Sequence, residues 1–270
     1  MDAHTEVFAV IGNPVKHSLS PFMQNLAFEK LSLNSVYSAF EVVDLESAVK
    51  GIKGLGIKGV SVTVPHKENI IKYLDEQSES AKKIGAVNTV TNKNGVLEGD
   101  NTDWKGFILS LREHSLIKGK KTLVIGAGGA SRGVCYGLAS ENADLFITNR
   151  TKSKGIELAK DFNAEFVDLE SIEKLEPEII INTTSVGMYP YINKSPVDKS
   201  LFKGKGVALD IVYNPLNTKF LRDAAMSGFK AVSGVGMFVY QGGLQFEKWT
   251  GKKFPFQIMK EKIFHKLRKG

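Results

Sequence analysis

The stretch TLVIGAGGASRG, residues 122–133, carries the clearest local signal for the fold. An apolar strand leads directly into GAGGAS (126–131), and a helical pattern follows. Gly126 allows a tight turn, and Gly128 removes a side chain so that a pyrophosphate can approach backbone N–H groups at the helix N-terminus. Ser131 takes a position where Gly or Ala is usual, but it is still small. A tight turn alone could use such glycines, yet the strand, helix and following strand together predict a dinucleotide site.

The end of the next strand distinguishes NAD from NADP. NAD sites usually carry an acidic residue there, which holds the ribose hydroxyls. This sequence has NRTKSK (149–154) instead, and Asp144 lies at the other end of the strand. The Arg150 guanidinium can hold a 2′-phosphate through two parallel hydrogen bonds, whereas a carboxylate would repel it. The sequence therefore favours NADP, with a solvated basic turn as the alternative.

Strand-like and helix-like segments alternate along almost the whole chain. Strand-like runs cover 7–12, 35–42, 59–64, 86–92, 121–126, 143–149, 178–184, 206–212 and 230–234. Helix-like runs include 21–31, 130–142 and 151–162. This alternation predicts an α/β protein with parallel sheets and helices on both faces. Ligands of such sheets bind beyond the carboxyl ends of the strands.

The length of 270 residues favours two domains over one. A boundary is expected within GDNTDWKGF (99–107), just before a helix that leads into the strand at 121–126. Two α/β units therefore join through a helix. The last part of the chain is expected to form two helices, interrupted at Gly251 and Pro255.

Composition limits the classes of function. The formal charge is +7, but the lysines are scattered, and the densest group, in 260–270, is typical of the solvated face of a helix. No basic patch interleaved with aromatic residues is visible, so nucleic-acid binding is not expected, and a basic balance suits small anionic substrates. Val7–Ile11 is too short for a signal core or a membrane span, so we expect a cytoplasmic protein.

Cysteine and histidine residues give little sign of redox or metal chemistry. The single cysteine, Cys135, lies in a helical pattern and is expected to be a small buried thiol. The histidines at 4, 17, 114 and 265 show no metal-ligand grouping. No metal site is therefore predicted.

Three polar segments could bind a substrate. Ser20 before Pro21 is expected to cap a helix, and together with Ser18 it could hold a carboxylate at the positive end of that helix. Lys67 follows the strand in SVTVPHK (61–67), where a binding residue of a parallel sheet would lie. Asp103 falls in the first turn of a predicted helix, where the dipole keeps an acid ionised. Taken singly, each could equally be a structural cap, an exposed lysine or a structural acid.

Considered together, the motifs are similar to those of the shikimate dehydrogenase family, over essentially the whole chain. The motifs are GNPVKHSLSP, SVTVPHK, GAVNTV, GDNTDWKGF, GAGGASR, NRT, NTTSVGM, DIVYNP and the pair Gly234 and Gln241. The resemblance implies a substrate domain at 1–102, completed by C-terminal helices at 237–270, and a Rossmann-type NADP domain at 103–236. Several ordered motifs at consistent spacing are more specific than any one of them.

The resemblance also implies residue roles. Ser18 and Ser20 would hold the shikimate carboxylate. Ring hydroxyls would be bound, or the site lined, by Thr63, Asn88, Asp103, Tyr213 and Gln241. Lys67 would be the acid–base residue, paired with Asp103 in catalysis, and the sequence leaves open which of the two carries the transferred proton. NADP would be bound by Gly126, Ala127, Gly128, Gly129, Ala130, Asn149, Arg150, Thr151 and Lys154, with Ile211 and Gly234 beside the nicotinamide.

One position departs from the family pattern. The family often has Asn where this chain has Ser61, two residues before Thr63, and the smaller hydroxyl is expected to change only local hydrogen bonds, for instance by replacing an amide contact to the backbone. No role is assigned to His66.

The implied activity is the reversible, NADP-dependent reduction of 3-dehydroshikimate to shikimate, in aromatic amino-acid and chorismate biosynthesis. The nearest alternative is a quinate/shikimate dehydrogenase with dual substrate or cofactor use. A non-enzymatic NADP-binding regulator would be expected to lack the Lys67–Asp103 pair. A small-molecule substrate is the expected partner, and the chain is expected to be a monomer or a homodimer.

Overall fold

The computed structural model describes residues 1–269 and divides into two compact units. Unit 1 contains residues 1–102 and 241–263, and unit 2 contains 103–240 and the residues from Phe264 onward. The chain passes from one unit to the other between Thr102 and Asp103, and returns within helix α8 (Val235–Thr250). The assignment of the units to substrate and cofactor remains a prediction.

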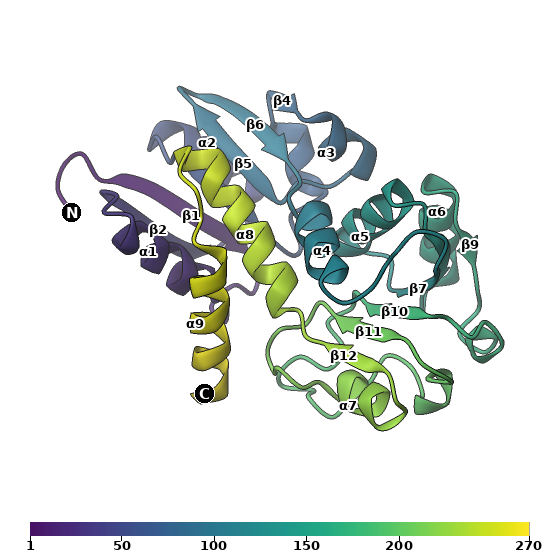
Figure 1. The fold of residues 1–270 in the computed structure, drawn as a ribbon. Helices are drawn as coiled ribbons and strands as arrows, with labels where there is room; N and C mark the ends of the chain where they lie inside the picture. The colour runs from purple at the N-terminus through teal and green to yellow at the C-terminus, as the bar shows by residue number, and fades with distance from the viewer. Residues whose placement is uncertain (270) are drawn as a thin grey trace. The chain divides into compact units, whose positions relative to one another are not determined.

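Unit 1 is built on a mixed sheet with strand order β2-β1-β3-β5-β6-β4 (Figure 1). The strands are β1 (Glu6–Gly12), β2 (Ser35–Glu41), β3 (Gly59–Val62), β4 (Glu76–Gln77), β5 (Thr89–Lys93) and β6 (Val96–Asp100). The expectation of parallel sheets is wrong for β5, which runs antiparallel to both β3 and β6.

The reversal at β5 has a local cause in the sequence. Asn94 and Gly95 form a two-residue loop between β5 and β6, and their φ angles are 53° and 93°. Asn-Gly is the favoured pair for this hairpin turn, whose twist matches that of the strands. β5 also pairs antiparallel with β3, so the amino end of β5 lies beside the carboxyl end of β3, with Thr89 opposite Ser61.

Both faces of the unit 1 sheet are covered by helices. One face packs against α2 (Leu45–Gly54), η1 (Asn69–Tyr73) and α3 (Glu79–Ile84). The other face packs against α1 (Ser20–Lys30) and the second half of α8, where the ring centroids of Phe28 and Phe246 lie 5.3 Å apart. α9 (Phe256–Lys269) follows after Gly251 (φ 66°), so the two predicted C-terminal helices are confirmed.

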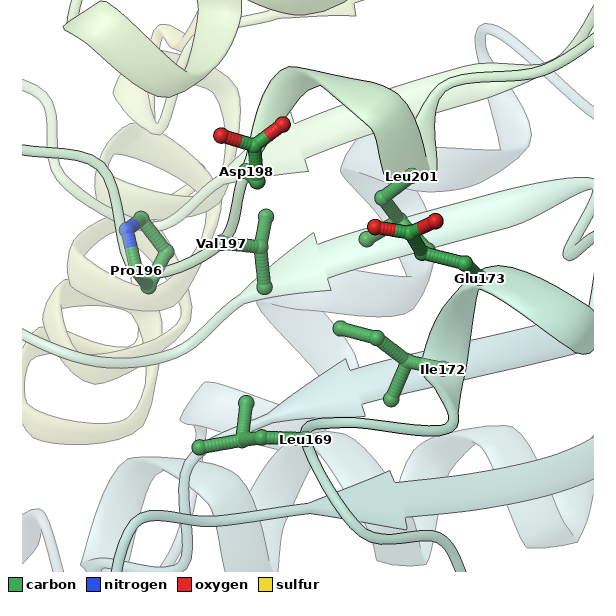
Figure 2. Close-up of a pocket in the computed structure, with 7 residues that line it drawn as sticks. All are labelled: Leu169, Ile172, Glu173, Pro196, Val197, Asp198 and Leu201. Carbon is green, nitrogen blue, oxygen red and sulfur yellow. The ribbon is translucent and has the colours of Figure 1, made fainter.

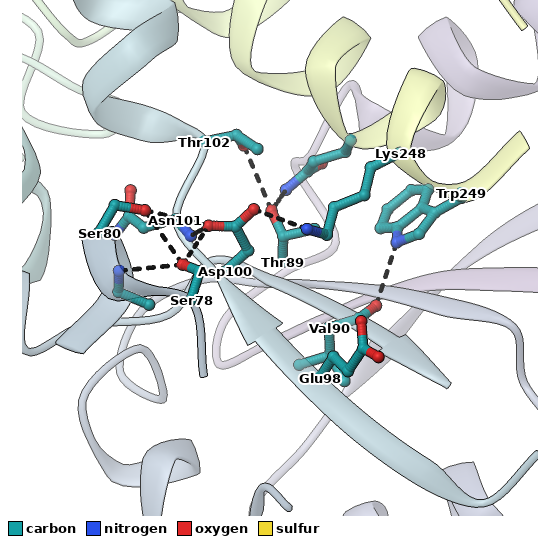
Figure 3. Close-up of polar contacts among 12 residues, drawn as sticks. Ser78, Ser80, Thr89, Val90, Glu98, Asp100, Asn101, Thr102, Lys248 and Trp249 are labelled. Atoms are coloured by element: carbon teal, nitrogen blue, oxygen red, sulfur yellow. Dashed lines mark hydrogen bonds and ion pairs between the residues drawn. The ribbon is translucent and has the colours of Figure 1, made fainter. Parts of the chain in front are cut away.

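Polar contacts fix α8 on the unit 1 sheet (Figure 3). Trp249 Nε1 donates to the Val90 carbonyl at 3.1 Å, and Lys248 Nζ pairs with Asp100 Oδ2 at 2.8 Å. The backbone of Gly59 passes directly under the indole, since a Cβ there would lie 2.5 Å from Trp249. α8 is therefore held against β3, β5 and β6.

Unit 2 is a six-stranded parallel sheet in the order β12-β11-β10-β7-β8-β9 (Figure 1). Its strands are β7 (Lys121–Ile125), β8 (Asp144–Thr148), β9 (Glu165–Phe166), β10 (Ile179–Asn182), β11 (Val207–Asp210) and β12 (Lys230–Val232). Counted from β7, this is the doubly wound order in which dinucleotides bind at the strand-order reversal, here between β7 and β10. The predicted α/β class with a Rossmann-type unit is confirmed.

Helices again cover both faces of unit 2. α4 (Asp103–Arg112), α5 (Gly129–Ser140) and α6 (Lys152–Asp161) pack in one apolar cluster. α7 (Lys219–Met226) packs in the other, with η2 (Ile172–Lys174) and η3 (Lys199–Leu201). Cys135 lies in α5 and is 0% exposed, so its prediction as a buried thiol is confirmed.

Candidate functional site

In unit 1, the segments that follow β1 and β3 lie side by side. The Thr63 N–H donates to the Ile11 carbonyl, and the Asn13 N–H donates to the Val64 carbonyl, both at 2.9 Å. A Cβ on Gly12 would lie 2.4 Å from the Thr63 methyl, so this close approach requires glycine. Ser18, which follows β1, and Thr63, which follows β3, are therefore both at the carboxyl edge of the sheet.

The start of α1 differs from the prediction. The residue before the helix is Leu19, which makes no side-chain cap, and α1 begins at Ser20 itself. The Ser18 hydroxyl instead accepts a hydrogen bond from the Ser20 N–H at 3.2 Å. Ser20 as the N-cap is therefore wrong, because Ser18 supplies the oxygen that satisfies a backbone donor of the first turn.

Lys67 lies in the turn after β3 and is half-buried. Its carbonyl accepts a hydrogen bond from the Val87 N–H at 2.8 Å, which ties this turn to the segment just before β5. Asn88, the next residue, is 2% exposed. The structure thus brings the backbone of Lys67 and that of Asn88 together, although the two residues belong to different loops.

His66 contributes to this turn in a way that sequence reasoning missed. Its ring is 6% exposed, and Nε2 lies 2.9 Å from the Val42 carbonyl, so Nε2 carries the proton and donates. His66 therefore attaches the turn, which also contains Lys67, to the loop after β2. The only sign of this role in the sequence was a polar residue between Pro65 and Lys67.

Asn88, Thr102 and Gln241 form a connected polar group in unit 1. Asn88 Nδ2 donates to Gln241 Oε1 at 3.3 Å and to Thr102 Oγ1 at 3.1 Å. Thr102 Oγ1 also lies 3.1 Å from the Gln241 carbonyl. Two predicted substrate residues, 153 positions apart, are thus in contact.

The remaining predicted substrate residues, Asp103 and Tyr213, belong to unit 2. Asp103 is the first residue of α4 and is 4% exposed, so its expected place in a first helical turn is confirmed. The ring of Tyr213 packs on Phe238 with centroids 4.5 Å apart. Because Lys67 is in unit 1, its pairing with Asp103 stays a prediction.

The glycine loop in unit 2 has the geometry expected of a dinucleotide site. Gly126 has φ 117°, and a Cβ there would lie 2.6 Å from Thr183 Oγ1, so both conformation and space require glycine. Gly128, the residue before α5, is extended, and a Cβ there would meet nothing within 4 Å. Packing within the protein therefore does not require glycine at position 128. The need to leave room for a phosphate group does explain a glycine there.

Ser131 is more than a small residue in this loop. Thr183 Oγ1 donates to the Ile125 carbonyl at 2.7 Å, so Ser131 Oγ must be the donor in their 2.6 Å contact. Ser131 Oγ in turn accepts from the Gly128 N–H at 3.1 Å. The hydroxyl therefore ties the glycine loop to the end of β10.

The segment after β8 presents an exposed basic surface. Asn149 Nδ2 donates to the Thr151 carbonyl at 2.9 Å, which shapes the turn before α6. Lys152 pairs with Asp168 at 2.7 Å, whereas Arg150 and Lys154 are exposed and form no ion pair within residues 1–269. These donors fit an anionic group such as a 2′-phosphate.

Ile211 and Gly234 lie together at the carboxyl end of β11. A Cβ on Gly234 would lie 2.3 Å from the Ile211 carbonyl oxygen, so the backbones meet only because residue 234 is glycine. Asp210, 0% exposed, accepts from Asn182 Nδ2 at 2.9 Å, from the Val212 N–H at 3.0 Å and from Thr218 Oγ1 at 2.6 Å. Sequence reasoning missed this network, which joins the loops after β10 and β11.

A small pocket of about 220 Å³ lies elsewhere in unit 2 (Figure 2). Leu169, Ile172, Val197 and Leu201 form much of its lining, with the carboxylates of Glu173 and Asp198 beside them. None of the predicted site residues lines it. Within residues 1–269, no group of three His, Cys, Asp or Glu side chains could hold a metal ion, and no helix could cross a membrane.

The fold and the glycine loop define a two-unit α/β protein with a Rossmann-type dinucleotide-binding unit. Three family models match successive parts of the chain: the shikimate dehydrogenase substrate binding domain at 10–90, shikimate/quinate 5-dehydrogenase at 109–218, and the shikimate 5′-dehydrogenase C-terminal domain at 234–264. A shikimate dehydrogenase (NADP(+)) of Caldanaerobacter subterraneus is 48% identical over 97% of this chain and 98% of its own length. The chain belongs to the shikimate dehydrogenase family, as its motifs predicted.

Solved structures agree with this family. A shikimate dehydrogenase crystallised in complex with NADP⁺ has a TM-score of 0.94 at 40% identity, over 99% of this chain and 97% of its own. The Thermus thermophilus enzyme in complex with NADP(H) and shikimate has a TM-score of 0.90 at 38% identity, over 96% and 99%. The likeness covers both units.

Proposed function

We propose that this protein catalyses the reversible, NADP-dependent reduction of 3-dehydroshikimate to shikimate, as an oxidoreductase of aromatic amino-acid and chorismate biosynthesis. The observation that carries the proposal is the carboxyl edge of the unit 1 sheet. There, segments from three strands supply hydroxyl, amide and ammonium groups, and Asn88 contacts Gln241 at 3.3 Å. A small, anionic, polyhydroxylated ring needs this combination of groups.

The substrate carboxylate is held, in this proposal, by Ser18 and Ser20 at the start of α1. Helix N-termini favour anions because their backbone N–H groups point outward and the helix dipole is positive there. Thr63, Asn88 and Gln241 bind ring hydroxyls from unit 1, and Asp103 and Tyr213 complete the site from unit 2.

The proton is managed at Lys67 Nζ. In the reducing direction the ammonium hydrogen-bonds the substrate carbonyl oxygen and donates its proton as negative charge develops there. In the oxidising direction the neutral amine accepts the hydroxyl proton. Asp103 holds the Lys67 side chain in place.

NADP(H), when bound, supplies or accepts the hydride. The residues proposed to hold it are the glycine loop Gly126–Ala130 for the pyrophosphate, and Asn149, Arg150, Thr151 and Lys154 for the adenosine 2′-phosphate. Ile211 and Gly234 border the nicotinamide. The open space at Gly128 and the exposed guanidinium of Arg150 support these roles.

A dual-specificity quinate/shikimate dehydrogenase is not favoured. The similar relatives are named shikimate dehydrogenase (NADP(+)). In addition, the segment after β8 offers an arginine and no carboxylate to the ribose. The cytoplasmic location and the monomer or homodimer state stay predictions from the sequence.

A spectrophotometric assay tests the proposal, with shikimate or quinate as substrate and NADP or NAD as cofactor. We expect turnover with shikimate and NADP to exceed that of every other pair. Comparable turnover of quinate or with NAD would favour the dual-specificity alternative, and absence of turnover with shikimate would contradict the proposal.

The same assay with Arg150→Ala tests the cofactor assignment. Because a hydrogen bond to a charged group contributes about 1.5–3 kcal/mol, we expect NADP to bind roughly 10–150-fold more weakly. NAD lacks the phosphate, so its affinity should hardly change. Equal losses for both cofactors would contradict the proposed 2′-phosphate site.

A further inference from the structure

A continuous chain of buried hydrogen bonds runs through unit 1 and ends at Asn88. Tyr37 Oη donates to Ser61 Oγ, and Ser61 Oγ donates to Gln245 Oε1, both at 2.6 Å. Gln245 Nε2 then donates to the Asn88 carbonyl at 2.9 Å and to Thr89 Oγ1 at 3.1 Å. We name Tyr37, Ser61, Gln245 and Thr89 the buried relay, since each is 7% exposed or less.

The backbone fixes the direction of every hydrogen bond in the buried relay. The Asn88 carbonyl can only accept, so the Gln245 amide must turn its NH₂ toward it and its oxygen toward Ser61. Ser61 therefore uses its single proton on Gln245 and accepts from Tyr37. Burial raises the pKa of Tyr37 above its ordinary value, so the phenol stays a donor.

Gln245, through Thr89, and the Thr102 backbone both hold the Asn88 side chain in one orientation. Thr89 Oγ1 accepts from Gln245 and donates to Asn88 Oδ1 at 2.7 Å. The Thr102 N–H donates to the same oxygen at 2.8 Å. Two donors on Oδ1 turn the Asn88 NH₂ to the opposite side, where it donates to Gln241 Oε1. Thr89 and Thr102 are drawn in Figure 3.

We propose that Gln245 is a positioning residue for the substrate site: through Ser61 and Thr89, and together with the Thr102 N–H, it holds the amides of Asn88 and Gln241 in the direction in which they donate. The inference rests on the proposed function, in which these two amides bind ring hydroxyls. A reversed Asn88 amide would face Gln241 Oε1 with its own oxygen, so the pair would no longer present the same donors to a ligand.

Ser61 and Gln245 act as a pair in this arrangement. The short Ser61 side chain reaches Gln245 Oε1, and the backbone contact to Asn88 is made by the amide of Gln245 on α8. Removing either residue leaves a buried polar atom of the other without its hydrogen bond. Burying a polar group without a partner costs free energy of folding. The two residues are 184 positions apart, and their coupling is a property of the fold.

A double-mutant cycle with Ser61→Ala, Gln245→Met and the double variant tests the inference. The dissociation constants of shikimate and of NADP are measured separately by titration, along with the melting temperature. Loss of one buried hydrogen bond should weaken shikimate binding by about 3–10-fold, with NADP binding changed less than about twofold. Because both residues serve one relay, the double variant should be no weaker than the more affected single variant.

Lys248→Met is the matched control. Lys248 also joins α8 to the unit 1 sheet, through Asp100, but contacts no member of the buried relay. It should lower the melting temperature slightly and leave shikimate binding unchanged. Exchange of the Asn88 side-chain NH₂ protons, followed by NMR, gives a readout independent of ligand and should become faster only in the relay variants.

Several outcomes would overturn the inference. They are unchanged shikimate binding in Gln245→Met, equal weakening of shikimate and NADP, additive effects in the double variant, or unchanged Asn88 exchange. If Gln245→Met does not fold, the milder Ser61→Ala gives the same comparison. Failure of the proposed function is seen separately, in a wild-type protein that neither binds nor turns over shikimate.

Discussion

At the scale of single residues, Lys67 has the central role in the proposed reaction. This half-buried lysine follows β3, and its carbonyl is held by the Val87 N–H at 2.8 Å. His66, bonded to the Val42 carbonyl, fixes the same turn. The turn that contains Lys67 is thus held by two hydrogen bonds to other loops. An acid–base group must stay in a fixed position relative to the substrate, and these bonds help to provide it.

Replacing Lys67 by alanine should lower kcat by about 10²–10⁴-fold, the usual scale for loss of a general acid–base group. The KM for shikimate should change less, because the carboxylate and hydroxyl contacts remain. Steady-state kinetics across a range of pH checks this.

Lys72→Ala is the control for that variant. Lys72 lies on η1 and packs over the Tyr73 ring at 4.9 Å, outside the proposed site. Its removal should leave kcat nearly unchanged. Near-wild-type turnover of Lys67→Ala at any pH would refute the assignment of Lys67.

Residue types were predictable from motifs, but tertiary partners were not. Gly126, Lys67 and Asp103 each belong to a local pattern that the sequence displays. Ser61 lies in the motif SVTVPHK, but its pairing with Gln245 is not visible there, because the two residues are 184 positions apart. The correction at Ser20 is of another kind: two hydroxyls near a helix start compete for one backbone donor, and spacing alone does not decide between them.

At the scale of elements, the carboxyl ends of β10 and β11 are joined through Asp210. Burial raises the pKa of this carboxyl to about 7, although the hydrogen bonds from Thr218, Val212 and Asn182 lower it. Between about pH 4 and pH 7 the folded state therefore keeps a proton that the unfolded chain has released. The resulting stability is present at acid pH and is lost as the pH rises toward 7.

Asp210→Asn removes this titrating group. Comparison with the wild type should therefore show whether Asp210 raises or lowers the free energy of unfolding as the pH increases. We expect the free energy of unfolding of the wild type, relative to that of the variant, to fall by about 2 kcal/mol between pH 5 and pH 8. The chain has two tryptophans, Trp104 in unit 2 and Trp249 in unit 1. In a Trp249→Phe background, urea unfolding followed by Trp104 fluorescence therefore reports on unit 2 alone. A difference that stays constant or grows with pH would contradict the expectation.

The long elements were predictable, and the short ones were not. Strands such as β1 and β7 have apolar runs long enough to recognise. β4 and β9 have two residues each, so no periodicity can appear. The strand β5 was predicted, at 86–92, but its antiparallel direction was missed, because the α/β alternation around it favoured a parallel arrangement. The signal for that direction, Asn94-Gly95, stands in the sequence.

At the scale of the whole molecule, the chain combines two α/β units with different sheets. The mixed sheet of unit 1 brings both the carboxyl end of β3 and the amino end of β5 to one edge, where the proposed substrate groups gather. The parallel sheet of unit 2 has its reversal of strand order beside the glycine loop. The proposed division of labour follows: unit 1 binds the polar ring, and unit 2 binds the dinucleotide.

The most direct test of the central claim follows the hydride itself. The enzyme is supplied with 3-dehydroshikimate and NADPH that carries two deuterium atoms at nicotinamide C4, and the shikimate formed is analysed by mass spectrometry. We predict one deuterium in each shikimate molecule, attached to the carbon that bore the ketone. Shikimate without deuterium, or no shikimate at all, would contradict it.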